Sequence, residues 1–262
     1  MMYPFIDPVA FWIGGLAIRW YSLAYLVGFF WVLFVGKYLI KQGVVTWISK
    51  ENFESLISST MLAVVAGGRV FYILFYQFYL FLENPLVIFK IWQGGMSFHG
   101  GVLGGVIFLL YKAKKIGVNF LQITDLILPW LPLGLGLGRL ANFVNGELWG
   151  RPTGKEWGVV FPWVDDQLRH PSQLYEFFLE GVVLSVVMYI CWRKLKREGA
   201  VTGVFLFFYG AFRIFVELFR SPDHQLGLLF DLNLTMGQCL SIPMILLGLY
   251  LFYNPVHAKK ML

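Results

Sequence analysis

The sequence predicts an all-α integral membrane protein with about seven transmembrane helices. Of its 262 residues, 58% are hydrophobic and only 14% are charged, whereas soluble domains carry about 25% charged residues. Apolar runs long enough to cross a hydrocarbon core of ~30 Å recur along the chain. A soluble fold of this length could not bury so much apolar surface, so a lipid bilayer is an expected partner.

The apolar runs define the expected spans in order. They lie near residues 18–39, 54–79, 95–111, 121–140, 172–192, 201–219 and 236–253. Basic clusters follow the first, third, fifth and seventh span: Lys37, Lys41 and Lys50; Lys112, Lys114 and Lys115; Arg193, Lys194, Lys196 and Arg197; Lys259 and Lys260. Cytoplasmic loops of membrane proteins carry such an excess of Lys and Arg. The pattern predicts an outside N-terminus and a cytoplasmic C-terminus, and it weighs against a nucleic-acid partner.

The remaining segments indicate a single domain over residues 1–262. The longest stretch between spans, about residues 141–171, is expected to form a small, irregular or partly helical cap on the outer face. A second outer loop at 78–93 is expected to hold a short interfacial helix at 86–92. Cys191 and Cys239 should lie on opposite membrane faces, so no disulfide is expected. The histidines, at positions 99, 170, 224 and 257, show no metal-ligand spacing, and no metal site is expected.

Ionisable side chains within the spans are the main functional signal, because each costs at least a few kcal/mol at membrane depth. They are Arg69, Asp125, Arg139, Glu176, Glu180, Arg213 and Glu217. Tyr209, Arg213 and Glu217 share one helix face at i, i+4 and i+8. Two interpretations are open. Arg213 and Glu217 form an ion pair with a purely structural role, or Glu217 and Tyr209 hold Arg213 so that its guanidinium faces a substrate phosphate.

The end of the fourth span gathers further polar groups. Arg139 is followed closely by Asn142, Asn145 and Glu147. Snorkelling to the interface would explain Arg139 alone, but the two amides and the carboxylate favour a site.

His99 and Arg69 leave alternatives open. His99 lies among glycines whose small-xxx-small spacing predicts helix packing; it is either a satisfied core histidine or a group that binds phosphate or moves a proton. Arg69 is either an architectural residue paired with Glu176 or Asp125, or part of the site. Tyr21 is an interfacial aromatic by default, and it could also point inward.

Together these residues predict a site for an anionic lipid in the outer half of the bilayer. Arginines recognise phosphate through a forked set of donors. The residues alone do not decide whether the lipid is cleaved, flipped or only bound. A flippase would be expected to show inverted repeats, and no internal similarity is visible. A seven-helix receptor would not require paired arginines beside two amides and a carboxylate.

The run Gly138–Gly150 carries a family resemblance. Its pattern Gly-Arg-x-x-Asn-Phe-x-Asn-x-Glu-x-x-Gly resembles the signature of the bacterial prolipoprotein diacylglyceryl transferases. Segments 94–101, 169–176 and 209–213 are also similar to that family, as are Asp7-Pro8 and Trp20-Tyr21. The stretch between Arg151 and Arg169 is shorter than in some members.

The resemblance implies a multi-pass enzyme of the bacterial cytoplasmic (inner) membrane. It would transfer the sn-1,2-diacylglyceryl group of phosphatidylglycerol to the lipobox cysteine thiol in a prolipoprotein signal peptide. The products would be a thioether and glycerol 1-phosphate, in the first step of lipoprotein maturation, with no cofactor and no metal. The family's important residues map onto Tyr21, His99, Arg139, Asn142, Glu147, Gly150, Tyr209, Arg213 and Glu217. His99, Arg139 and Arg213 are the expected catalytic residues, and the others, with Arg139, are expected to bind substrate.

Overall fold

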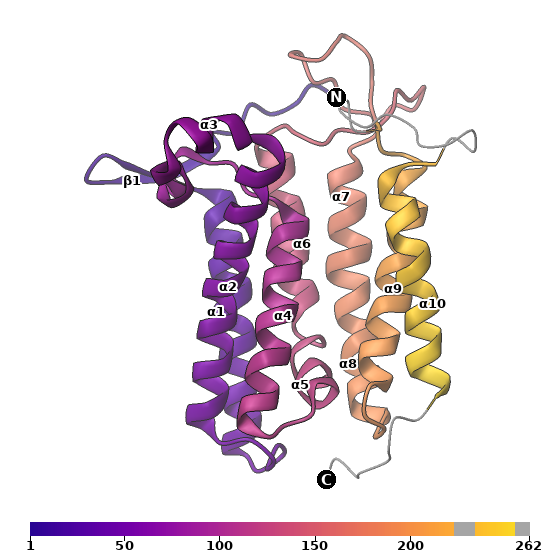
Figure 1. Cartoon of the computed structure of the whole chain (residues 1–262). Helices are drawn as coiled ribbons and strands as arrows, with labels where there is room; N and C mark the ends of the chain where they lie inside the picture. Colours follow the sequence, from indigo (N-terminus) through magenta and orange to yellow (C-terminus); the bar gives the residue numbers. More distant parts are fainter. Residues whose placement is uncertain (223–233, 255–262) are drawn as a thin grey trace. The chain divides into compact units, whose positions relative to one another are not determined.

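The structure is a computed structural model that describes residues 1–222 and 234–254. Lys259, Lys260, His224 and His257, named above, lie outside the described residues. The elements are β1 (Val9–Ile13), β2 (Leu16–Arg19), α1 (Trp20–Lys41), α2 (Lys50–Tyr76), α3 (Phe78–Glu83), η1 (Pro85–Phe89), η2 (Ile91–Gln93), α4 (Phe98–Ile116), α5 (Phe120–Ile127), α6 (Leu131–Val144), α7 (Ser172–Glu176), η3 (Phe177–Val183), α8 (Leu184–Lys194), α9 (Ala200–Glu217) and α10 (Met236–Tyr253) (Figure 1).

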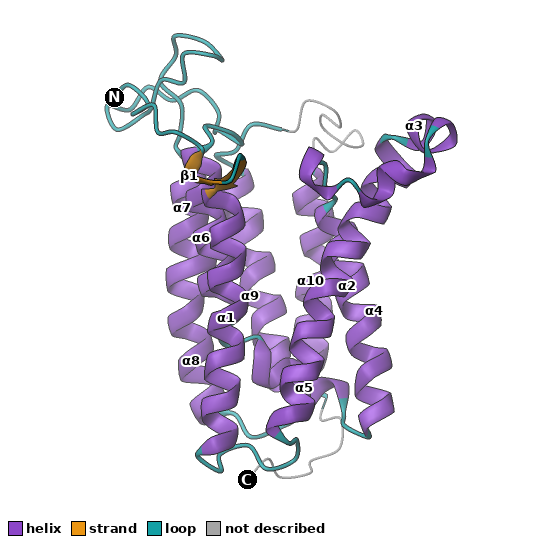
Figure 2. Cartoon of the chain, turned by 90° about the vertical axis from the view of Figure 1, so that its left-hand side faces the viewer, coloured by secondary structure: helices purple, strands orange, loops and turns teal. Residues whose placement is uncertain are grey.

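The predicted helical membrane class agrees with the helices. Within the described residues, five stretches are long and apolar enough to cross a membrane, namely α1, α2, Ser172–Lys194, α9 and α10. The pair α5 and α6 would make a sixth. The α4 helix is not among them, since Lys112, Lys114 and Lys115 occupy its end. The sequence did not predict the antiparallel hairpin of β1 and β2, drawn in orange in Figure 2.

The fourth predicted span is broken. A single helix was expected over 121–140, but α5 and α6 meet at an angle of 55°. Pro129 lies in the break. Proline has no backbone N–H and its ring clashes with the preceding turn, so it ends or kinks a helix. The fifth span is continuous, but its middle, η3, is a π-helix.

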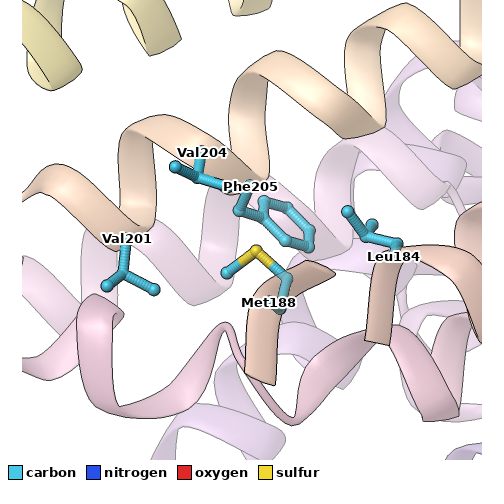
Figure 3. Packing of buried hydrophobic residues seen from close by; sticks show 5 residues of the cluster. All are labelled: Leu184, Met188, Val201, Val204 and Phe205. Atoms are coloured by element: carbon cyan, nitrogen blue, oxygen red, sulfur yellow. The ribbon is translucent and has the colours of Figure 1, made fainter. Parts of the chain in front are cut away.

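The internal contacts of the chain divide into two compact units. Residues 1–32 and the described residues from Thr124 to Asn254 form unit 1, and Leu33–Ile123 form unit 2. The apolar core of unit 1 lies where α8 meets α9 (Figure 3), and its buried members are Leu184, Met188, Val201, Val204 and Phe205.

Two close glycine contacts fix the helices of unit 1 that carry the polar residues. A Cβ atom built on Gly28 of α1 would lie 2.8 Å from the Cα atom of Gly134 in α6. A Cβ built on Gly136 would lie 2.8 Å from the Cα of Gly181 in η3. Only glycine permits such backbone approach. As a result, α6 packs between the start of α1 and the π-helical segment.

Glycines also join α2 to α4 in unit 2. A Cβ on Gly104 would lie 3.0 Å from the Cα of Gly67, and one on Gly101 would lie 3.3 Å from Val64. The helix packing predicted from the spacing of these glycines is therefore confirmed. In place of the short helix predicted at 86–92, the chain forms two short 3₁₀ segments, η1 and η2.

The segment after α6 is irregular over residues 145–171 and pairs with the N-terminal chain. The Tyr3 N–H donates to the Val160 carbonyl over 3.0 Å. The Tyr3 ring packs with Val159 and Phe161, and all three are buried. The Asp165 carboxylate binds Arg169 over 2.5 Å, and this contact holds the pKa of Asp165 below its usual range.

Candidate functional site

The α9 helix aligns the first group of predicted residues. Arg213 Nη2 lies 2.5 Å from Glu217 Oε1, one helical turn away. A Cβ on Gly237 in α10 would lie 2.8 Å from Glu217 Cδ and 3.1 Å from Arg213 Nε. The absence of a side chain at Gly237 therefore leaves room for the ion pair against α10.

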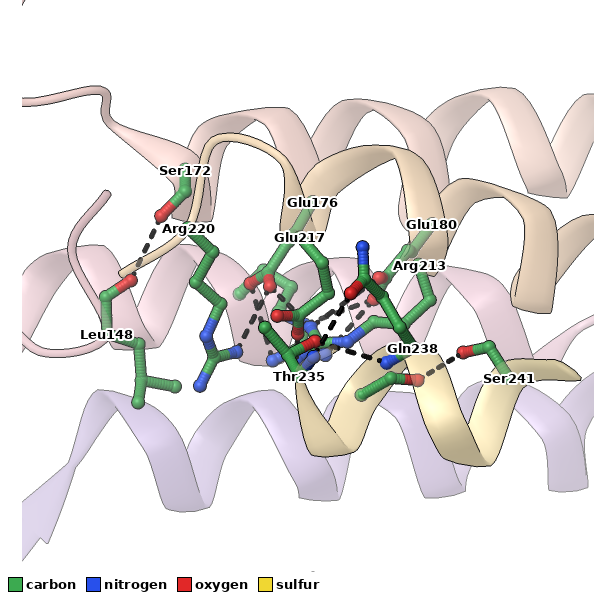
Figure 4. Close-up of polar contacts among 12 residues, drawn as sticks. Leu148, Ser172, Glu176, Glu180, Arg213, Glu217, Arg220, Thr235, Gln238 and Ser241 are labelled. Atoms are coloured by element: carbon green, nitrogen blue, oxygen red, sulfur yellow. Dashed lines mark hydrogen bonds and ion pairs between the residues drawn. The ribbon is translucent and has the colours of Figure 1, made fainter. Parts of the chain in front are cut away.

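Carboxylates from the fifth span join Arg213 to Arg139; Figure 4 shows Glu176 and Glu180 beside Arg213. Arg213 Nη1 donates to Glu176 Oε1 over 2.5 Å, and Arg139 Nη1 lies 3.4 Å from the other oxygen, Oε2. Arg139 Nε and Nη2 both donate to Glu180 Oε2, over 3.2 Å and 3.1 Å. The two arginines predicted from separate spans are thus brought together by one shared carboxylate.

Arg220 completes a network of three arginines and three carboxylates. Its Nη1 lies 3.3 Å from Glu176 Oε1. The exposed fraction of the side chain is 19% for Arg139 and 13% for Arg213, against 0% for both Glu176 and Glu180. Both glutamates are fully buried, and the small exposed part of the network belongs to the side chains of Arg139 and Arg213.

The N–H donors of Arg139 indicate what kind of group this arginine can bind. A guanidinium carries five N–H donors, and the described hydrogen bonds of Arg139 use the Nε donor and one Nη2 donor, both on Glu180. Arg139 Nη1 lies 3.4 Å from Glu176 Oε2, within ion-pair distance. Planar donor pairs of this kind bind phosphate oxygens in a bidentate manner.

Tyrosines lie beside the arginines. Tyr21 and Tyr25 hydroxyls are 3.3 Å apart on α1, and Tyr25 is within electrostatic range of Arg139 and Tyr209. Tyr209 is in turn within range of Arg139 and Arg213. Tyr21 is therefore linked to the arginines through Tyr25, a residue that the sequence did not single out.

The polar residues after Arg139 converge on one carboxylate. Asn142 Nδ2 donates to Glu147 Oε1 over 2.8 Å, and Asn145 Nδ2 donates to the same oxygen over 3.0 Å. Gln173 Nε2 donates to the Glu147 carbonyl over 2.6 Å. Gln173 lies on α7 one turn before Glu176, so this amide and carboxylate group continues from the arginine network.

Gly150 permits a close backbone crossing beside this group. A Cβ atom at that position would lie 2.6 Å from the carbonyl oxygen of Phe219. The Gly150 N–H donates to the His170 carbonyl over 2.9 Å. Any side chain would push the irregular segment away from the end of α9.

His99 belongs to unit 2, where it occupies the first turn of α4. It is exposed, and its ring meets that of Phe98 edge-on, with 5.7 Å between the centroids. This exposure is the opposite of what a satisfied core histidine requires. Arg69, also in unit 2, does not take the predicted carboxylate partners, because its donors go to backbone carbonyls.

Sequence reasoning named Glu176 and Glu180 and offered Glu176 as one possible partner of Arg69, whereas Glu176 pairs with Arg139, Arg213 and Arg220. It missed Arg220, Tyr25 and Gly237. The sequence does indicate that the two glutamates need partners from other helices. They are one turn apart, in a span with no basic residue until Arg193. Two buried carboxylates on one face require cations from other spans.

The chain matches one protein family over most of its length. Residues 8–254 match the family model described as prolipoprotein diacylglyceryl transferase. The chain belongs to this family. A phosphatidylglycerol--prolipoprotein diacylglyceryl transferase of Pseudoalteromonas atlantica is 50% identical over 99% of this chain and 92% of its own length. Proteins of the same name from Legionella pneumophila and Nitrosomonas europaea are each 49% identical over 97% of this chain, and over 98% and 91% of their own lengths.

The transferase-family match covers every predicted site residue. All of them lie between Tyr21 and Glu217, inside the matched range. The recognition made from the run Gly138–Gly150 is confirmed, and the arginine network just described lies within a diacylglyceryl transferase chain.

Proposed function

We propose that this chain transfers the sn-1,2-diacylglyceryl group of phosphatidylglycerol to the lipobox cysteine of a prolipoprotein. The observation that carries the proposal is the arrangement of Arg139 and Arg213, whose guanidinium groups share the fully buried Glu176. Phosphatidylglycerol has one phosphodiester, and the forked donors of two arginines match its oxygens.

The reaction forms a carbon–sulfur bond and breaks a carbon–oxygen bond. The cysteine thiolate is the nucleophile, and it attacks the diacylglyceryl carbon that carries the phosphate ester. The ester oxygen keeps the bonding electrons and leaves as part of glycerol 1-phosphate. Arg139 and Arg213 stabilise the negative charge that develops on the departing phosphate. The thiol proton goes to a base, and His99 is the residue proposed for that role, since histidine is the side chain that most often serves as a general base.

The other residues complete the polar pocket and hold its geometry. Tyr21, Asn142 and Tyr209 contact the headgroup in this proposal. Glu217 orients Arg213, while Glu147 orients Asn142 and its neighbours. Gly150 keeps the segment after α6 close to the end of α9.

We also propose the finer topology for which the sequence argues. The α4 helix serves as a seventh span beside the six described above, because its first fourteen residues contain no charged side chain. The N-terminus and segment 141–171 lie on the outer face of the bacterial cytoplasmic membrane, and the C-terminus is cytoplasmic. The basic residues near the ends of α1, α4 and α8 support this orientation.

The deciding experiment is an assay of the purified protein with phosphatidylglycerol and a lipobox peptide. A transferase releases glycerol 1-phosphate and increases the peptide mass by one diacylglyceryl group. A matched peptide with serine in place of cysteine is the control, since it cannot supply a thiolate. Movement of labelled phosphatidylglycerol between leaflets without glycerol 1-phosphate would instead indicate a flippase and refute the proposal.

A further inference from the structure

Arg69 has a different environment from the arginines of the ionic network. Its side chain is buried in α2, and within the described residues no ion pair joins it to a carboxylate. Its guanidinium instead meets backbone carbonyl groups. The Tyr72 ring lies beside it, with 5.8 Å from Arg69 Cζ to the ring centroid.

The five N–H donors of Arg69 are each used once. Nη2 donates to the carbonyls of Val87, over 2.7 Å, and Lys90, over 3.0 Å. Nη1 donates to the carbonyls of Gly94 and Gly95. Nε donates to the carbonyl of Ile88 over 3.3 Å. A guanidinium has no sixth donor, so Arg69 has none left for a lipid phosphate.

These carbonyls belong to one continuous segment that leads into α4. Val87 and Ile88 lie in η1, and Lys90 directly follows its end. Gly94 and Gly95 follow η2. The Ser97 N–H then donates to the carbonyl of Gly68, next to Arg69, over 2.9 Å. Ser97 Oγ accepts from the Gly100 N–H over 3.2 Å and so caps α4. His99 lies within the turn that this cap begins.

We propose that Arg69 is a positioning residue that holds segment 87–97 on α2 and thereby fixes His99 at the start of α4. The inference rests on the proposed function, in which His99 acts at the reacting groups. An arginine is required because it presents five donors in a rigid plane, whereas a lysine ammonium has three donors on a flexible stem.

The glycines of the segment are consistent with this role. Gly94 and Gly95 both have positive φ, of 80° and 77°. This conformation turns both of their carbonyls toward Arg69, and few other residues adopt it without strain. Gly95 also lies directly against the Tyr72 ring. The segment thus has the backbone shape that a five-point contact needs.

The test compares Arg69→Lys in two backgrounds, the wild-type chain and His99→Ala, in the glycerol 1-phosphate assay. In the wild-type chain we expect kcat to fall roughly 10²-fold, the size of effect that a misplaced catalytic group produces. In the His99→Ala background, the same substitution should change the rate by less than about twofold. The side chain that Arg69 positions is then already absent, so the effects of the two substitutions do not add.

A second readout does not depend on activity. The rate at which diethyl pyrocarbonate modifies His99, followed by peptide mass spectrometry, should differ between Arg69→Lys and the wild type at equal melting temperature. Lys90→Ala is the matched control, because it keeps the carbonyl that Arg69 uses and removes only a side chain. It should leave both the rate and the modification of His99 unchanged.

The outcomes separate this inference from the proposed function. A wild-type protein that releases no glycerol 1-phosphate refutes the proposed function, while the His99 modification still tests the contact. An active wild type with equal losses for Arg69→Lys in both backgrounds, or with unaltered His99 modification, overturns the positioning role.

Discussion

Replacing Glu176 with glutamine tests whether charge balance holds the arginine network together. Glu176 is fully buried and lies within 3.4 Å of Arg139, Arg213 and Arg220. Glutamine has nearly the same shape, so the substitution removes the charge and leaves the packing. Its amide nitrogen would also face guanidinium donors and would have no acceptor for its own N–H groups.

The expected magnitude follows from the count of charges. The network holds three guanidinium groups against Glu176, Glu180 and Glu217. After Glu176→Gln, one buried positive charge lacks its partner, and breaking a buried pair in this way costs about 3–5 kcal/mol. For a chain of this length, such a loss lowers the melting temperature by roughly 6–20 °C, at ~2–4 °C for each kcal/mol.

The assay is thermal unfolding of the purified protein in detergent, with Glu156→Gln as the matched control. Glu156 is exposed, so its substitution should leave the melting temperature unchanged. Adding Arg220→Gln to Glu176→Gln restores equal numbers of opposite charges, and the double variant should be more stable than the sum of the two single losses predicts. A melting temperature for Glu176→Gln equal to that of the control would refute the reasoning.

Four further outcomes are expected. Arg139→Ala should abolish glycerol 1-phosphate release while the protein still elutes as a folded species in size-exclusion chromatography; full activity would remove the phosphate contact from the mechanism. Arg213→Lys should lower kcat roughly 10²–10³-fold, as loss of a donor to developing charge does, because an ammonium cannot replace the fork; wild-type rates would contradict this. Gly134→Ala should cost about 1–3 kcal/mol of stability through overpacking against Gly28, and an unchanged melting temperature would show that the helices can separate freely. Burial lowers the pKa of the His170 imidazole, so the unfolded chain binds a proton there more readily than the folded one. His170 therefore costs no stability above pH ~6.5, and the free energy of unfolding decreases as the pH falls below that value. The melting temperature should decrease less on acidification in His170→Gln than in the wild type, and parallel pH curves would contradict the assignment.

Much of this protein could be predicted from the order of its residues. Hydropathy depends on local composition, so the apolar runs located five helices that could cross a membrane to within a few residues. The fourth expected span is broken at Pro129, and the third, α4, is not among the helices that are apolar enough over their whole length. The family signature is a contiguous run, Gly138–Gly150, so the sequence alone was enough to recognise it. The shared face of Arg213 and Glu217 followed from helical spacing alone.

The partners of the buried charges were decided only by the tertiary structure. Glu176 could pair with any arginine at the same depth, and helical periodicity does not rank Arg69 above Arg139 or Arg213. Backbone contact at Gly136 and Gly181, together with the π-helical turn of η3, sets which cation meets which carboxylate. Arg69 in turn is satisfied by carbonyl groups, and every residue has a carbonyl, so its acceptors have no signature in the sequence. Local pattern determines which segments are helical, and long-range packing determines which side chains meet.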